Sequence, residues 1–86
     1  MTPFDRLLIA VSLLDERPIR SQFVCDLLTG HDRDMTYLQA SWCLNRFISR
    51  TPLTIADRKT MQSELDNILN LHALECKQVE TDAHQP

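Results

Sequence analysis

Apolar residues recur at helical spacing in four stretches of this chain, and polar or proline-containing breaks separate the stretches. The first stretch begins at Thr2 and Pro3, which suit a helix N-terminus because threonine can cap it and the first turn needs no proline N–H. Its apolar face comprises Phe4, Leu7, Leu8, Val11 and Leu14. Ile9, Ala10 and Leu13 widen that face. We therefore expect this helix to be buried on more than one side, by the rest of the domain or by a second copy.

A shorter second helix is expected from about Pro18 or Ser21 to Thr29. Its apolar face comprises Ile19, Phe23, Val24, Leu27 and Leu28. Gly30 follows at a position where a left-handed C-terminal cap is favoured. The polar turn over residues 30–34 contains two aspartates, and either of them is a candidate N-cap for the next helix.

The third expected helix, over residues 35–49, carries two apolar faces. One face comprises Tyr37, Ala40, Leu44, Phe47 and Ile48. Met35, Leu38 and Trp42 fall nearly opposite, close to Asn45, Arg46 and Ser49, at about 100° per residue. Two apolar faces indicate either a central core helix or a helix that presents a second surface to a partner.

The last expected helix starts at Thr54-x-x-Asp57, which resembles a capping box with aspartate in place of glutamate, and runs to about Gln78. Its core face comprises Met61, Leu65, Ile68, Leu69, His72, Cys76 and Val79. This helix is the longest of the four, so its C-terminal half should extend past a compact bundle. Leu71 and Leu74 lie off the main stripe and need cover from elsewhere.

These patterns predict an all-α fold: a compact, bundle-like domain of about four helices, arranged as two helical hairpins, with a long C-terminal helix. We expect residues 1–80 to form a single domain and residues 81–86 to form a frayed tail. The chain has one glycine, Gly30, which cannot supply the tight turns of a β-rich fold.

Charge is distributed unevenly. The net charge is −3, but residues 1–60 hold eight bases against seven acids, and residues 61–86 hold one base against five acids. The acidic final third should repel nucleic acids and membrane surfaces. No apolar run reaches the roughly 20 residues that a membrane span needs, and no secretory signal is visible. Three widely spaced cysteines are expected to be small buried thiols, which predicts a reducing, cytoplasmic location.

Catalytic patterns are missing from the sequence. One glycine cannot form a phosphate-binding loop or a nucleophile elbow. His72 and Cys76, one helical turn apart, could form the edge of a metal site or activate a thiol. Filling the core stripe of the last helix is the simpler interpretation, because no second ligand pair at suitable spacing accompanies them. We therefore predict a protein that is not an enzyme and that uses no metal and no cofactor.

The leading hypothesis is a helical protein–protein interaction module: a small adaptor, inhibitor or chaperone-like regulator that binds a larger protein. Tryptophan, methionine and arginine are enriched at such interfaces. The predicted partner-binding residues are Met35, Leu38, Trp42 and Arg46. A homodimer is also expected, with Leu71 and Leu74 as a possible dimer seam. The competing interpretation of Trp42 is that its ring closes the core where the third and fourth helices cross.

A dimeric helix-turn-helix transcription regulator is the alternative, because residues 18–50 form a helix, a glycine-containing turn and a helix. Its DNA-binding residues would be Arg20, Thr36, Gln39, Arg46 and Arg50. This hypothesis ranks second because the turn carries two aspartates and the region lacks a basic footprint.

Overall fold

The structure is a computed structural model that describes residues 1–30 and 33–84, with side chains described as far as Lys77. It contains four helices: α1 (Pro3–Ser12), α2 (Arg17–Gly30), α3 (Tyr37–Arg50) and α4 (Ile55–His84). No strand occurs among the described residues. The predicted all-α class, the number of helices and the long last helix are confirmed.

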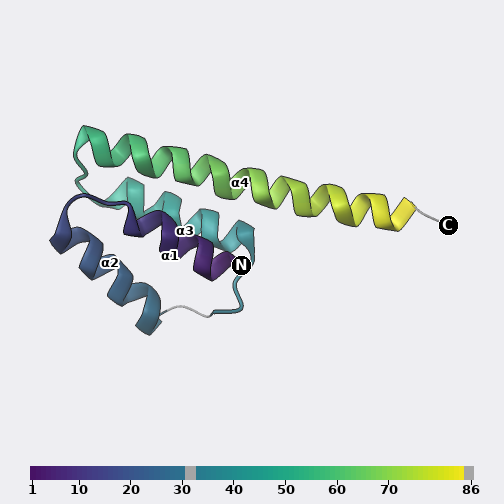
Figure 1. Cartoon of the computed structure of the whole chain (residues 1–86), viewed down its shortest axis with the longest axis horizontal. Helices are drawn as coiled ribbons and strands as arrows, with labels where there is room; N and C mark the ends of the chain where they lie inside the picture. Colours follow the sequence, from purple (N-terminus) through teal and green to yellow (C-terminus); the bar gives the residue numbers. More distant parts are fainter. Residues whose placement is uncertain (31–32, 85–86) are drawn as a thin grey trace.

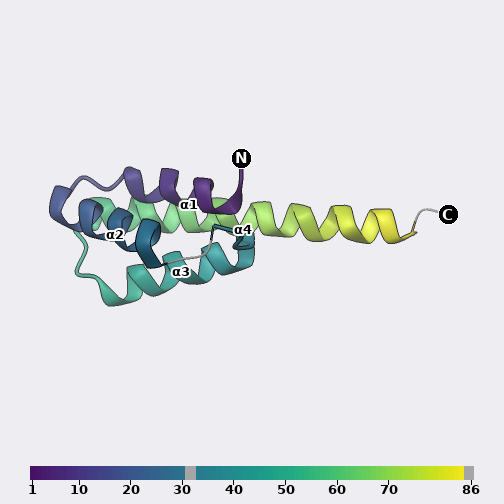
Figure 2. The ribbon, with the colours of Figure 1, turned by 90° about the horizontal axis from the view of Figure 1, so that it is seen from below.

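The helices are packed in neighbouring pairs. α1 contacts α2, α3 contacts α4, and α1 also contacts both α3 and α4. α3 and α4 run antiparallel, and α1 lies along the same pair, as Figure 1 and Figure 2 show. α1 with α2, and α3 with α4, form the two hairpins expected from their short connections.

One apolar core joins all four helices. Its buried members are Phe4, Leu7, Ala10, Val11, Leu14, Leu27, Met35, Ala40, Leu44, Phe47, Ile48, Met61, Leu65 and Ile68. The predicted core positions of α3 are therefore largely confirmed, with Tyr37 only partly buried against the cluster. Ile9 and Leu13, in contrast, are 44% and 49% exposed. The described residues therefore leave this side of α1 uncovered.

The helix ends are capped differently from the expectation in two places. Gly30 is the last residue of α2, and no described residue has a positive φ, so the predicted left-handed cap at Gly30 is wrong. α3 starts at Tyr37, and its N-cap is Thr36 rather than an aspartate. Thr36 and Gln39 form a full capping box: the Gln39 N–H donates to the Thr36 hydroxyl over 3.1 Å, and the Thr36 N–H donates to the Gln39 side chain over 2.9 Å. Asp32 lies outside the described residues.

Asp57 has a different role from the one its motif predicts. The Asp57 N–H donates to the Thr54 hydroxyl over 3.1 Å, which is half of a capping box. The carboxylate does not complete the box. It is buried, and it accepts the backbone N–H groups of Asp15 at 2.9 Å and Glu16 at 3.4 Å. Asp57 therefore ties the start of α4 to the connection between α1 and α2.

A second polar contact links α1 to α4. Arg6 donates from Nη2 to Glu64 Oε2 over 2.6 Å, and the two side chains are only 17% and 13% exposed. The other guanidinium nitrogen, Nη1, is buried without a hydrogen-bond partner. This ion pair helps to set the position of α1 along the axis of α4.

The C-terminal half of α4, residues 70–84, projects beyond the bundle; we call it the overhang. Figure 1 and Figure 2 show it as the yellow-green part of the helix, standing clear of α1, α2 and α3. α4 continues to His84, past the expected end at Gln78. Residues 81–84 of the predicted frayed tail lie in this helix, and residues 85–86 lie outside the described part. Within that part, no helix has both the length and the apolar character that crossing a bilayer requires.

Candidate partner-binding surface

Trp42 lies on the outer face of α3 and is 60% exposed. It borders a hollow of about 240 Å³ between α3 and α4. The hollow is lined by Leu38, Ser41, Trp42, Asn45, Leu65 and Leu69. The Ser41 hydroxyl donates to the Leu38 carbonyl over 2.6 Å, so it is already satisfied within α3. A mainly apolar hollow beside an exposed indole can receive an apolar side chain from another molecule. We call this group the Trp42 surface.

The other predicted partner-binding residues have different positions. Leu38 is half-buried in the wall of the hollow. Arg46 is exposed one turn after Trp42. The prediction that Met35 lies on the partner-binding surface is wrong, because Met35 is only 8% exposed and belongs to the core. Met35 precedes the N-cap of α3, so the helical projection of 100° per residue does not apply to it.

Leu65 and Leu69 contribute to the Trp42 surface from α4, which the sequence did not reveal. The periodicity placed both on the core face of the last helix. Leu65 is buried, whereas Leu69 is 41% exposed where α4 begins to leave the bundle. Their spacing showed that both leucines lie on one face of α4. Only the packing of α3 on α4 shows that Leu69 borders the same hollow as Trp42.

The predicted dimer seam lies on α4 near the start of the overhang. Leu71 is half-buried, and Leu74 is 58% exposed. The described residues do not supply the cover that the sequence led us to expect for Leu74. Neither residue lines the hollow beside Trp42.

Four of the five residues of the DNA-binding alternative lie on α3 or at its N-cap, and the fifth, Arg20, lies on α2. Thr36 and Gln39 are used to cap α3. Arg20 donates from Nη1 to the Leu14 carbonyl over 3.0 Å, at the connection between α1 and α2. Arg46 and Arg50 are exposed. Thr36 and Arg50 lie at opposite ends of α3, roughly 21 Å apart at 1.5 Å per residue.

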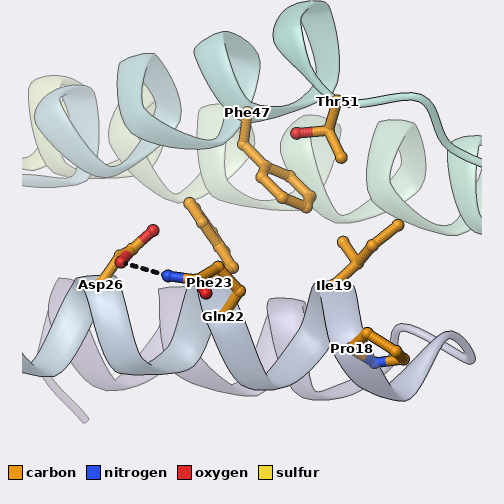
Figure 3. A pocket seen from close by; sticks show the side chains of 7 residues that line it. All are labelled: Pro18, Ile19, Gln22, Phe23, Asp26, Phe47 and Thr51. Carbon is orange, nitrogen blue, oxygen red and sulfur yellow. Dashed lines mark hydrogen bonds between the residues drawn. The ribbon is translucent and has the colours of Figure 1, made fainter.

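A second apolar cleft lies between α2 and α3. Its volume is about 310 Å³, and its lining residues are Pro18, Ile19, Gln22, Phe23, Asp26, Phe47 and Thr51. Figure 3 shows the rings of Phe23 and Phe47 meeting across it; their centroids are 4.0 Å apart. Asp26 accepts a hydrogen bond of 3.0 Å from Gln22. The sequence placed both phenylalanines on core faces without indicating that they pair.

The three cysteines differ in exposure, and none forms a disulfide in the described part. Cys25 and Cys76 are exposed, so the expectation of buried thiols is wrong for both. Cys43 is half-buried on α3. Burial raises the pKa of the Cys43 thiol, and the nearby Arg46 guanidinium lowers it in part.

Cys43 should therefore react more slowly with iodoacetamide than Cys25 and Cys76 at neutral pH. A raised pKa leaves less thiolate at a given pH, and the thiolate is the nucleophile. Mass spectrometry of peptides from the folded protein, at successive times, measures the three rates. Equal rates in the folded protein would contradict this prediction, and equal rates after unfolding in urea are the control.

Comparison with known proteins identifies no relative. No protein-family model, curated protein or solved structure matches this chain. A function must therefore be argued from the chemistry of the chain's own surfaces.

Proposed function

We propose that this protein is a small helical interaction module, an adaptor, inhibitor or chaperone-like regulator, that binds a larger protein through the Trp42 surface. The observation that carries the proposal is the 60% exposure of Trp42 beside an apolar hollow. Tryptophan is enriched among the residues that dominate binding energy. Exposed apolar groups gathered in one place are typical of interaction sites.

The binding mechanism is the burial of apolar surface without turnover. An apolar side chain of the partner enters the hollow between Leu38 and Leu69, and the Trp42 ring covers it. Arg46 lies at the rim, where its guanidinium can pair with a carboxylate of the partner. The core face of α3 is formed by other residues, so the Trp42 surface can bind without disturbing the fold.

Replacing Trp42 by alanine should weaken binding at least about 30-fold and leave the fold intact. The exposed ring contributes little to folding, so the free energy of unfolding should change by no more than about 0.5–1 kcal/mol. An aromatic anchor of an interface typically contributes at least about 2 kcal/mol, which is roughly a 30-fold loss of affinity. Affinity capture followed by titration of the purified partner measures the effect. Trp42 is the only tryptophan, so its fluorescence reports binding in the wild type.

Ile55→Ala is the matched control, because Ile55 is an apolar residue that is 80% exposed and lies away from the hollow. This variant should retain the partner. Equal retention by the Trp42 and Ile55 variants would contradict the proposed surface. Unfolding of Trp42→Ala would support the competing interpretation, in which the ring closes the core.

The proposal includes a homodimer formed through the overhang of α4. Leu74 is exposed on the overhang, and Leu69 is exposed just before it on a different side of the helix. One candidate face contains Leu71 and Leu74, and the other contains Leu69, His72 and Cys76. The exposed thiols of Cys25 and Cys76 further support a reducing compartment, the cytoplasm, as the place where the protein works.

A further inference from the structure

His72 and Cys76 lie one turn apart on the overhang, with their reactive atoms close together. Cys76 Sγ is 3.7 Å from His72 Nε2. In a tetrahedral zinc site, Zn–S is about 2.3 Å and Zn–N about 2.0–2.1 Å, so a sulfur and a nitrogen ligand stand about 3.5–3.6 Å apart. The pair therefore has nearly the spacing of one edge of such a site.

The thiol and the imidazole lie within hydrogen-bonding distance of each other, but they do not fill the core. The simpler interpretation of the sequence was that both residues fill the core stripe of the last helix. Cys76 is exposed, and neither residue belongs to the buried core cluster. His72 is only half-buried. A thiol and an imidazole are thus held side by side at the surface of a projecting helix.

Two ligands do not complete a structural zinc site, which takes four. The described residues contain no group of three or more His, Cys, Asp or Glu side chains that could hold a metal ion. Within the described part of the chain no third ligand joins the pair, so another molecule is the simplest source of the two that remain. A second copy supplies one more histidine and one more cysteine, which gives the common Cys₂His₂ set.

The arrangement of the overhang favours a second copy as the source. Leu65, Leu69, His72 and Cys76 are spaced alternately by four and three residues, which is the pattern of a coiled-coil seam. This stripe is buried at Leu65 and is 41% exposed at Leu69, where it leaves the bundle. Two helices that pair along it bring both His72–Cys76 pairs to the same seam. Leu74 lies about 200° around the helix from Cys76, on the other side.

Charge makes this pairing dependent on a cation. Residues 70–84 hold one base against three acids, so two overhangs repel each other. A divalent ion bound by both copies overcomes that repulsion through its four metal–ligand bonds, since its own charge is balanced by the two thiolates. Metal binding should therefore promote the dimer, and its removal should separate the two copies.

We infer that two copies of this chain bind one zinc-type divalent ion between their overhangs, through His72 Nε2 and Cys76 Sγ of each copy. This inference rests on the proposed homodimer and assigns the face that forms it. Each cysteine binds as the thiolate and releases its proton to the solvent, while each imidazole binds in its neutral form. It departs from the expectation, based on spacing alone, that the protein uses no metal.

The test uses Co²⁺ as a spectroscopic probe for the full chain, kept reduced and freed of metal beforehand. Titration should produce tetrahedral d–d bands and thiolate-to-cobalt absorption that saturate at one ion per two chains. Size-exclusion chromatography with light scattering should show the mass doubling over the same range. Zn²⁺ should displace Co²⁺, and EDTA should restore the monomer.

Variants identify the ligands. Cys76→Ser and His72→Gln should both remain helical by circular dichroism. Cys76→Ser should lose the thiolate absorption, and both variants should lose the mass doubling at the same metal concentration. Cys25→Ser is the matched control, because Cys25 is also an exposed cysteine outside any disulfide. Trp42→Ala should dimerise with metal like the wild type, so this test is independent of partner binding.

Three results would overturn the inference. One is the absence of thiolate-to-cobalt absorption. Another is binding of one ion per chain without a change in mass. The third is a reduced dimer that persists in EDTA, which would point to the Leu71 and Leu74 face instead. Loss of the dimer on Leu74→Ser, with Cys76→Ser unaffected, would support that face directly.

Discussion

Replacing Asp57 by alanine should lower the free energy of unfolding by about 2–4 kcal/mol. The Asp57 carboxylate is 2% exposed and accepts the backbone N–H groups of Asp15 and Glu16. Hydrogen bonds to a charged group contribute about 1.5–3 kcal/mol each, and a buried donor left without its acceptor costs about 1–3 kcal/mol. The 3.4 Å contact to Glu16 is the weaker of the two, so we expect less than the sum of two strong bonds.

Asp66→Ala is the control for this prediction, since Asp66 is an exposed carboxylate on the same helix. Its effect should stay within about 0.5 kcal/mol. Asp57→Asn should be intermediate, because the amide keeps one acceptor oxygen but no charge. Urea unfolding followed by circular dichroism at 222 nm measures all three. Equal midpoints for the Asp57→Ala and Asp66→Ala variants would show that Asp57 does not hold the α1–α2 connection.

Leu7→Ala should lower the free energy of unfolding by about 2–5 kcal/mol, the range for a fully buried leucine that leaves a cavity. Leu7 is 0% exposed on α1, the helix that contacts all three others. A domain of this length has a total stability of about 4–13 kcal/mol. The variant should therefore lie close to its unfolding midpoint even without denaturant, if the wild type is near the lower limit.

Leu13→Ala is the matched control on the same helix. Leu13 is 49% exposed, so its loss should change the stability of the monomer by about 0.5 kcal/mol or less. The same urea titration, with the two variants compared at equal protein concentration, measures the difference. A large effect at Leu13 that grows with protein concentration would mean that a second copy covers this residue.

The Asp57 and Leu7 predictions concern residues that hold the bundle together. The proposed partner binding and metal binding concern residues that the bundle leaves exposed. Asp57 and Leu7 should change stability. Trp42 should change partner binding, and Cys76 should change metal-dependent association. Measuring stability and binding for each variant therefore separates the fold from the function.

Local interactions explain why the sequence alone determined the helices. The 3.6-residue period of apolar positions, the proline-containing breaks and the Thr2 cap all act within a few residues, so four helices and an all-α class could be derived from them. The same reasoning found Leu38, Trp42 and Arg46 opposite the core face of α3. It was wrong at Gly30, which ends α2 without a positive φ. It was also wrong at Met35, because the Thr36–Gln39 box starts α3 after that residue.

Only the tertiary structure decided which apolar residues remain uncovered and which distant groups meet. Periodicity gives the direction of a side chain but not the length of the neighbouring helix that covers it. Leu69 and Cys76 share the core stripe of α4, yet they are exposed because α4 is longer than its partners. The bonds from the connection between α1 and α2 to Asp57, and the hollow beside Trp42, likewise join residues far apart in the sequence. Their positions follow from the packing of whole helices, which no local pattern encodes.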